Sequence, residues 1–174
     1  MERKLYDLMI RDAAILSGDD WLQPGYLVLD DGLITKIGSG APPAQLVEQC
    51  SQVLRGTGMA ALPGLTNAHT HLSQVFMRGL GGGRALLPWL KELIWPLQKS
   101  LSVEDTHLAA LLGLVENLRC GATHVVNNHK ITTSPAHADA VLNAAKQIGL
   151  DFTLAYGWAD RGDNSPAPDA VLRE

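Results

Sequence analysis

The sequence predicts an α/β protein in which a small β-sheet module precedes parallel βα units. Residues 1–60 consist of short β-rich runs separated by turns. From about residue 60, apolar runs of strand length alternate with helical periodicity, in the order strand, helix, strand, helix, strand. That alternation is typical of a parallel sheet. Hydrophobic residues make up 46% and charged residues 18% of the chain, which is an ordinary globular composition.

Composition and charge exclude several classes of protein. The 174 residues carry a formal net charge of -4 and no basic stripe, so no nucleic-acid partner is expected. No run reaches the roughly 18 apolar residues of a membrane span. Asp7 and Arg11 interrupt the apolar start, which does not resemble a signal peptide. Cys50 and Cys120 are expected to be free thiols in a reducing compartment. We therefore expect a cytoplasmic protein with no membrane partner.

A first domain is predicted over residues 1–60 as the N-terminal part of the β-module. The runs 25–29 and 33–37 flank Asp30-Asp31-Gly32, and this arrangement predicts a hairpin because glycine supplies the positive φ of a tight turn. The runs 5–10 and 13–16 are two further strand candidates. Strand patterns of this kind argue for a fold and not for a function.

A second domain is predicted over residues 61–174, and it begins with a strand that leads into a histidine pair. Pro96 lies inside the next predicted helix and should kink or end it. Ser102 fits the N-cap of the following helix, and Gly121 fits the position just after its end. Apolar residues between Leu108 and Leu118 form one face of that helix. The predicted elements are helices over 86–99 and 102–119, a strand over 122–127, a helix over 134–148 and a strand over 152–156.

The strongest chemical signal is the pair His69 and His71 at the end of the first predicted strand of this domain. Residues i and i+2 of a strand point to the same side. Two imidazoles held in this way can both reach one metal ion at about 2.0–2.1 Å. The carboxyl ends of parallel strands are also where βα proteins carry their chemistry. The alternative is two polar side chains at a strand end with no role as ligands.

The sequence around this pair resembles a known family. The run LPGLTNAHTHL (62–72) resembles the first-strand motif of the amidohydrolase superfamily. The run PWLKELIWPLQKSLSVED (88–105), followed by a helix and GATHVVN (121–127), is similar to the chlorohydrolase and aminohydrolase branch. That branch contains triazine hydrolases and 8-oxoguanine, guanine and adenosine-type deaminases. The resemblance implies a small β-sandwich beside a (β/α)8 TIM barrel. It also implies that His69 and His71 bind one divalent metal ion, Zn2+ or Fe2+.

Other residues are candidates for contact with a substrate. The resemblance implies that Gln74, three residues after the pair, presents a polar group to the substrate, and that Trp89 belongs to a pocket-lining segment. His129 follows the second predicted strand, and this position favours a hydrogen bond to substrate; the alternative is an exposed loop histidine. His107 and His137, each in the first turn of a predicted helix, are expected on the surface.

The implied reaction is hydrolysis at a ring carbon of a nitrogen heterocycle, with a metal-activated water replacing an amine or a halide. A (β/α)8 barrel needs about 250 residues, so residues 61–174 are expected to form a partial, truncated barrel with about three strands. The family's third histidine ligand, its water-assisting histidine and its aspartate have no position in this sequence. The chain alone is therefore expected to be inactive, and the full-length form is expected to be a homo-oligomer that acts on a small heterocyclic molecule.

Two other functions fit the same motif. Cyclic-amide hydrolases of the dihydroorotase and hydantoinase type also carry the histidine pair, but they add a carboxylated lysine after a later strand. The segment 88–96 favours the deaminase branch. The remaining alternative is a non-catalytic remnant with a partial metal site or none.

Overall fold

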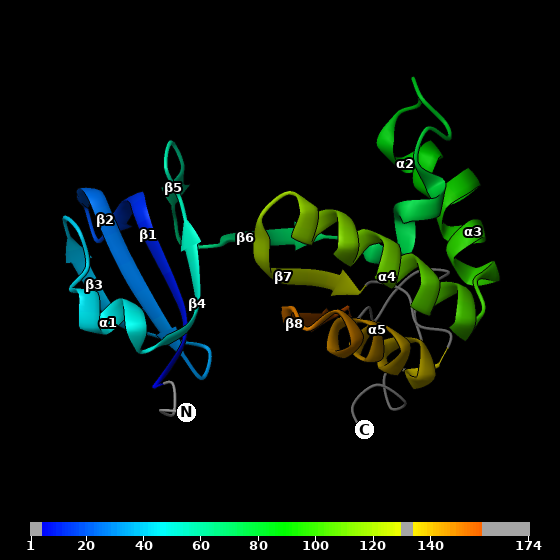
Figure 1. Ribbon diagram of the computed structural model, residues 1–174. Coiled ribbons are helices and arrows are strands. Elements are labelled where there is room, and N and C mark those ends of the chain that lie inside the picture. The colour runs from blue at the N-terminus through cyan, green and yellow to red at the C-terminus, as the bar shows by residue number, and fades with distance from the viewer. Residues whose placement is uncertain (1–4, 130–133, 158–174) are drawn as a thin grey trace. The chain divides into compact units, whose positions relative to one another are not determined.

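The computed structural model describes residues 5–129 and 134–157. The chain forms two compact units, with the boundary between Pro63 and Gly64 (Figure 1). The sequence places this boundary after residue 60. Each unit has its own sheet.

The first unit is built on a five-stranded sheet in the order β3-β2-β1-β4, with β5 also paired to β1. Strand β1 runs antiparallel to β2 and parallel to β4 and β5. Helix α1 (Ala44–Glu48) leads into β4 and contributes Leu46 to a core that contains Met9 and Val28. The strands are β1 (Tyr6–Ser17), β2 (Asp20–Asp30), β3 (Leu33–Ser39), β4 (Cys50–Arg55) and β5 (Ala60–Ala61).

The predicted hairpin joins β2 to β3. Asp31 and Gly32 have φ values of 49° and 75°, the left-handed conformation that a two-residue hairpin turn requires at both positions. The two strand runs expected before it form one strand instead. The pairing of β1 with β2 shifts around Asp12, whose φ is 59°, so a bulge joins both runs into a single ladder.

The second unit contains a parallel three-stranded sheet in the order β6-β7-β8, as the alternation of strands and helices predicts. Helices α4 and α5 pack against each other and cover one face of this sheet (Figure 1). Val125 on β7 lies in their shared core with Leu114 of α4 and Val141 of α5. The elements are β6 (Leu65–Thr70), α4 (Val103–Arg119), β7 (Ala122–His129), α5 (Pro135–Ile148) and β8 (Asp151–Tyr156).

The connection from β6 to α4 is helical but is not one helix. A 3-10 segment η1 (Leu72–Met77) follows β6 directly. The single helix predicted over 86–99 is divided into α2 (Leu86–Trp89), a π-helical segment η2 (Leu90–Ile94) and α3 (Trp95–Ser100). Pro96 lies at the start of α3. Its ring lacks an amide hydrogen and conflicts with the carbonyl four residues earlier, so regular α-helical bonding cannot continue through it.

The ends of α4 agree with the sequence prediction. The Ser102 hydroxyl accepts from the amide of Asp105 at 3.0 Å, while the Asp105 carboxylate accepts from the amide of Ser102 at 2.9 Å. These two bonds form a capping box. The pKa of the Asp105 carboxyl is lowered mainly by a hydrogen bond that it accepts from the Ser102 hydroxyl at 2.7 Å, and also by the bond from the Ser102 amide. Gly121, with a φ of 85°, follows the helix in the left-handed conformation.

The buried face of α4 only partly matches the apolar face predicted from the sequence. Leu108, Leu112 and Leu118 are exposed. The buried face carries the small residues Ala110 and Gly113 together with Leu114, and Leu111 packs partly against the same core. Small side chains allow the backbones to approach closely, which a row of leucines would prevent.

A candidate metal site at the end of β6

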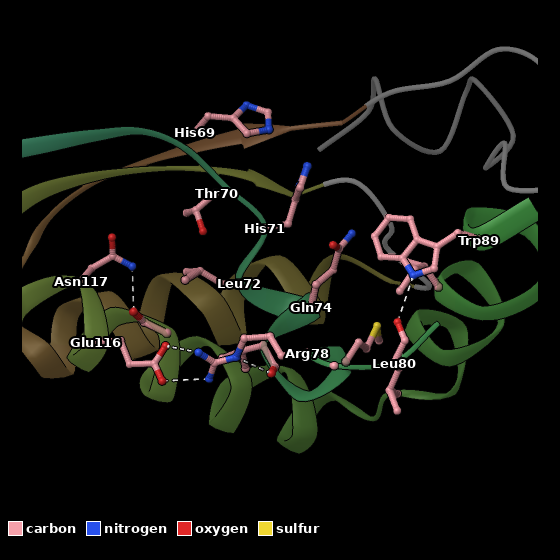
Figure 2. A pocket seen from close by; sticks show the side chains of 15 residues that line it. His69, Thr70, His71, Leu72, Gln74, Arg78, Leu80, Trp89, Glu116 and Asn117 are labelled. Carbon is pink, nitrogen blue, oxygen red and sulfur yellow. Dashed lines mark hydrogen bonds and ion pairs between the residues drawn. The ribbon is translucent and has the colours of Figure 1, made fainter. Parts of the chain in front are cut away.

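The histidine pair lies at the carboxyl end of β6. His69 is the second-last residue of the strand, and His71 directly follows the strand. Their ring centroids are 4.9 Å apart, and the ring planes are nearly perpendicular, at 84° (Figure 2). His69 is exposed and His71 is half-buried. The two imidazoles are therefore neighbours, as their spacing in a strand predicts.

One residue of the adjacent strand contacts both rings. The Nδ1–H of His71 donates to the main-chain oxygen of Asn128 over 2.7 Å. The side-chain Nδ2 of Asn128 donates to Nδ1 of His69 over 3.0 Å. Because a carbonyl oxygen only accepts, the hydrogen of a neutral His71 ring is on Nδ1. Its Nε2 therefore keeps a lone pair that can bind a metal.

Asparagine side chains also fix the backbone before and after the pair. Asn67 accepts from the amide of His69 at 3.2 Å and donates to Asn117 of α4 at 2.7 Å. Asn127, with 1% of its surface exposed, accepts from the amide of Leu72 at 3.0 Å. These contacts connect both ends of the histidine segment to α4 and β7.

A cavity of about 470 Å³ opens beside the pair, and His69, His71, Gln74 and Trp89 all line it (Figure 2). Gln74 is part of η1, and its main-chain N–H donates to the main-chain oxygen of His71 at 2.9 Å. The indole nitrogen of Trp89 donates to the main-chain oxygen of Leu80 at 3.3 Å. Four of the five site residues predicted from the sequence therefore border one space.

An ion pair supports the wall of this cavity. Arg78 and Glu116 form two parallel hydrogen bonds, of 2.9 Å and 2.8 Å, which join the end of η1 to α4. The hydrogen bond with Glu116 raises the pKa of the Arg78 guanidinium. The pair is exposed, and its paired geometry orients the wall more than it stabilises the fold.

His129, the fifth predicted residue, lies elsewhere. It is on the face of β7 that also carries Val125 and Asn127 and packs against the helices, and 3% of its surface is exposed. Its ring is 6.1 Å from that of Tyr156. Burial, with a smaller contribution from His137, lowers the pKa of His129 to about 4. Among residues 5–129 and 134–157, no hydrogen-bond partner contacts its Nε2.

The surface position expected for His137 is wrong. The side chain is buried, its Nε2–H donates to the main-chain oxygen of Leu101 at 3.2 Å, and its Nδ1 contacts the Ser134 hydroxyl at 3.1 Å. His107 is half-buried and donates from Nδ1 to the main-chain oxygen of Ala140. Both rings join separate segments around α4 and α5.

The low pKa of His129 predicts a loss of stability in mild acid. Its ordinary pKa is 6.5, so between pH 6.5 and about 4 the unfolded chain binds a proton that the folded chain does not. The free energy of unfolding should therefore fall as pH falls through this window, by up to about 3 kcal/mol from this residue. Urea unfolding at pH 7, 5.5 and 4.5 measures the effect. The variant His129→Phe should have a flatter profile than the wild type; parallel profiles would contradict the prediction.

The sequence from β5 onward decides the family, because residues 60–173 match the amidohydrolase family over most of the chain. The chain belongs to the amidohydrolase family. The resemblance of the histidine motif to the amidohydrolase superfamily is confirmed.

Three amidohydrolases illustrate the similarity. A 5-methylthioadenosine/S-adenosylhomocysteine deaminase of Pyrococcus furiosus is 34% identical over 155 residues, which are 88% of this chain and 34% of that protein. A mutant atrazine chlorohydrolase of Arthrobacter aurescens TC1, complexed with zinc and atraton, superposes with a TM-score of 0.76 at 25% identity, over 91% of this chain and 37% of that one. An adenosine deaminase of Xanthomonas campestris with bound zinc superposes with a TM-score of 0.74 at 25% identity, over 87% of this chain and 34% of that one.

The predicted α/β fold, a partial (β/α)8 barrel preceded by a β-module, is confirmed. The chain spans about a third of the length of the curated relatives it matches. In the described part of this amidohydrolase, no group of at least three His, Cys, Asp or Glu side chains is arranged so that it could hold a metal ion. In the same part, no helix is both long enough and apolar enough to cross a membrane.

Asn128 is the site residue that the sequence did not single out. The sequence predicts a strand that ends at Asn127, whereas β7 continues to His129. Alternation along the longer strand places Asn128 on the face opposite His129 and Asn127. Extending the strand by two residues would have placed Asn128 on this face, but its position beside the histidine pair depends on the register between β6 and β7.

Proposed function

We propose that this amidohydrolase chain supplies two metal ligands and part of a pocket wall to a hydrolase that acts on carbon-nitrogen bonds other than peptide bonds. In its most specific form, the reaction is the hydrolytic deamination, or the dechlorination, of a nitrogen heterocycle. The observation that carries the proposal is the contact between the His69 and His71 rings at the carboxyl end of β6, on the border of a cavity of about 470 Å³.

The donor set fits one divalent metal ion, Zn2+ or Fe2+. Imidazole nitrogen suits both metals, and the bond from His71 Nδ1 to the Asn128 carbonyl leaves His71 Nε2 available. Ligating histidines are commonly oriented in this way through their second nitrogen. A bound metal of this kind lowers the pKa of a water molecule to about 7, which makes hydroxide available near neutral pH.

The described chain provides two of the ligands that such a site needs. Catalytic zinc usually has three protein ligands and an open position. The pair therefore holds a metal weakly by itself, and the 174-residue chain alone has no turnover. The full-length protein to which such a chain contributes is a cytoplasmic homo-oligomer in this proposal.

Gln74 and Trp89 are the proposed substrate contacts of this chain. Both line the cavity beside the histidines. The indole of Trp89 offers an apolar face against which a planar ring can stack, and the amide of Gln74 can both donate and accept a hydrogen bond. His129 is left out of the proposed contacts because it is buried on the other face of β7 and does not line the cavity.

The named relatives support the substrate class. One is a 5-methylthioadenosine/S-adenosylhomocysteine deaminase and another is an atrazine chlorohydrolase complexed with zinc. The chemistry common to these names is the replacement of an amine or chlorine on a nitrogen heterocycle. We propose the same class of substrate for the complete enzyme.

Metal titration of the purified chain tests this proposal. Competition with a chromophoric chelator should show one Zn2+ site, and the double variant His69→Ala/His71→Ala should bind more than about 100-fold more weakly. This bound is reasonable because losing a residue that only orients a ligand already costs 10–100-fold. His124→Ala is the matched control, since that imidazole contacts Thr153 and Asp151 away from the pair. Equal affinity in the double variant, or deaminase turnover by the chain alone, would contradict the proposal.

A further inference from the structure

We infer that Asn128 is a positioning residue that prepares both histidines for the metal, through two different groups. Its main-chain carbonyl fixes His71 in one tautomer, and its side-chain amide adapts to either tautomer of His69. The inference rests on the proposed metal site and adds to it a residue outside the histidine motif.

The carbonyl contact is part of the sheet. Asn128 pairs with Ala155 in the parallel ladder between β7 and β8, so its main chain is held in place. The 2.7 Å bond from His71 Nδ1–H to its oxygen therefore does not depend on the Asn128 side chain. His71 is held with Nε2 deprotonated whatever residue occupies position 128.

The side-chain contact behaves differently. Nδ2 of Asn128 can only donate, so Nδ1 of His69 accepts, and the ring hydrogen is on Nε2. In that state His69 cannot use Nε2 as a ligand. Rotating the Asn128 amide by 180° places Oδ1 where Nδ2 was. Oδ1 then accepts from Nδ1–H, and Nε2 of His69 becomes free for the metal.

Asparagine suits this exchange because its amide oxygen and nitrogen have nearly the same size and opposite hydrogen-bonding roles. One side chain can thus satisfy His69 both with and without metal. A carboxylate at position 128 can only accept, so it would hold His69 permanently in the metal-binding tautomer. A methyl group would leave the His69 ring unoriented, although the carbonyl contact to His71 would remain.

The test compares Asn128→Ala and Asn128→Asp with the matched control Asn143→Ala, an exposed asparagine on α5. Zn2+ affinity is measured by chelator competition, and imidazole tautomers of the metal-free chain are measured by 15N NMR. Asn128→Ala should weaken Zn2+ binding about 10–100-fold. The separate variant Asn128→Asp should bind Zn2+ at least as tightly as the wild type. The His69 signals should change in Asn128→Ala, whereas His71 should stay in the Nδ1–H tautomer.

The outcomes separate this inference from the proposed function. If the wild type binds Zn2+ and Asn128→Ala binds it equally well, the positioning role is overturned and the metal site stands. A structural role alone would weaken both Asn128 variants equally, which also overturns the inference. If the wild type binds no Zn2+, the proposed site fails. The NMR spectrum still decides the inference in that case, because a wild-type His71 with its hydrogen on Nε2 would refute it.

Discussion

Leu114→Ala is expected to lower the free energy of unfolding by about 2–5 kcal/mol, the range for a buried leucine truncated to alanine. Leu114 lies on α4 with none of its surface exposed, in one core with Leu72, Val125 and Val141. The substitution removes buried methyl and methylene groups and leaves a cavity between the helices and the sheet. The surrounding structure relaxes only partly into such a cavity, which adds to the loss.

The same substitution should weaken the metal site. Leu72 directly follows His71 and packs into the core around Leu114. A Cβ added to Gly113, the neighbour of Leu114, would lie 2.7 Å from Cδ2 of Leu72, so this region of α4 fits closely around the residue after the histidine pair. Loosening the core releases the backbone that holds His71 against Asn128.

Urea unfolding followed by circular dichroism measures the stability of this variant, and chelator competition measures its Zn2+ affinity. Leu112→Ala is the matched control, because Leu112 is on the same helix and 41% of its surface is exposed. That control should lose much less stability than Leu114→Ala and bind Zn2+ as the wild type does. Equal losses in the two variants would contradict the prediction, because the exposed Leu112 would then contribute as much stability as the buried Leu114.

Local backbone geometry explains which parts of the structure were predictable. The contact between His69 and His71 follows from the two-residue period of a strand, which needs no knowledge of the tertiary fold. The cap at Ser102 and the glycine turn at Gly32 are likewise set by hydrogen bonds and φ values within a few residues.

Tertiary packing explains what the sequence did not show. Periodicity identified the apolar face of α4 by its leucines, but the helix buries the face where Ala110 and Gly113 allow close approach. Strand β4 pairs in parallel with β1, more than 40 residues earlier, and no local pattern specifies that pairing. The burial of His129 and His137 has the same origin, because neighbouring elements enclose side chains that are usually exposed.

The role of Asn128 shows the same limit within the site. Its contact with His71 uses a main-chain oxygen, which every residue has, so the identity of the side chain predicts nothing about it. The register between β6 and β7, with Thr70 opposite Asn127, brings Asn128 beside the pair. The ligands are therefore visible in the sequence, whereas the residue that orients them is a property of strand pairing.

Gly64→Ala is expected to destabilise the second unit by about 1–3 kcal/mol, the usual cost of overpacking a closely fitted position. Gly64 immediately precedes β6. A Cβ there would overlap Oγ1 and Cγ2 of Thr123 on β7 and would lie 2.7 Å from its Cβ. The amide of the next residue, Leu65, donates to the main-chain oxygen of Gly121 at 2.9 Å, so the added methyl group forces apart the first contacts between β6 and β7.

This displacement should reach the histidine pair, because β6 is six residues long and carries His69 near its other end. We expect both a lower melting temperature and weaker Zn2+ binding. Gly82→Ala is the matched control: its Cβ would meet nothing within 4 Å and its φ is not in the left-handed region, so its effect should stay within about 0.5 kcal/mol. The double variant Gly64→Ala/Thr123→Gly removes the overlapping side chain and should recover part of the Zn2+ affinity. If the double variant recovers no Zn2+ affinity, the weaker binding of Gly64→Ala does not arise from overlap with Thr123. That result would contradict the idea that the pairing of β6 with β7 places His69 beside Asn128.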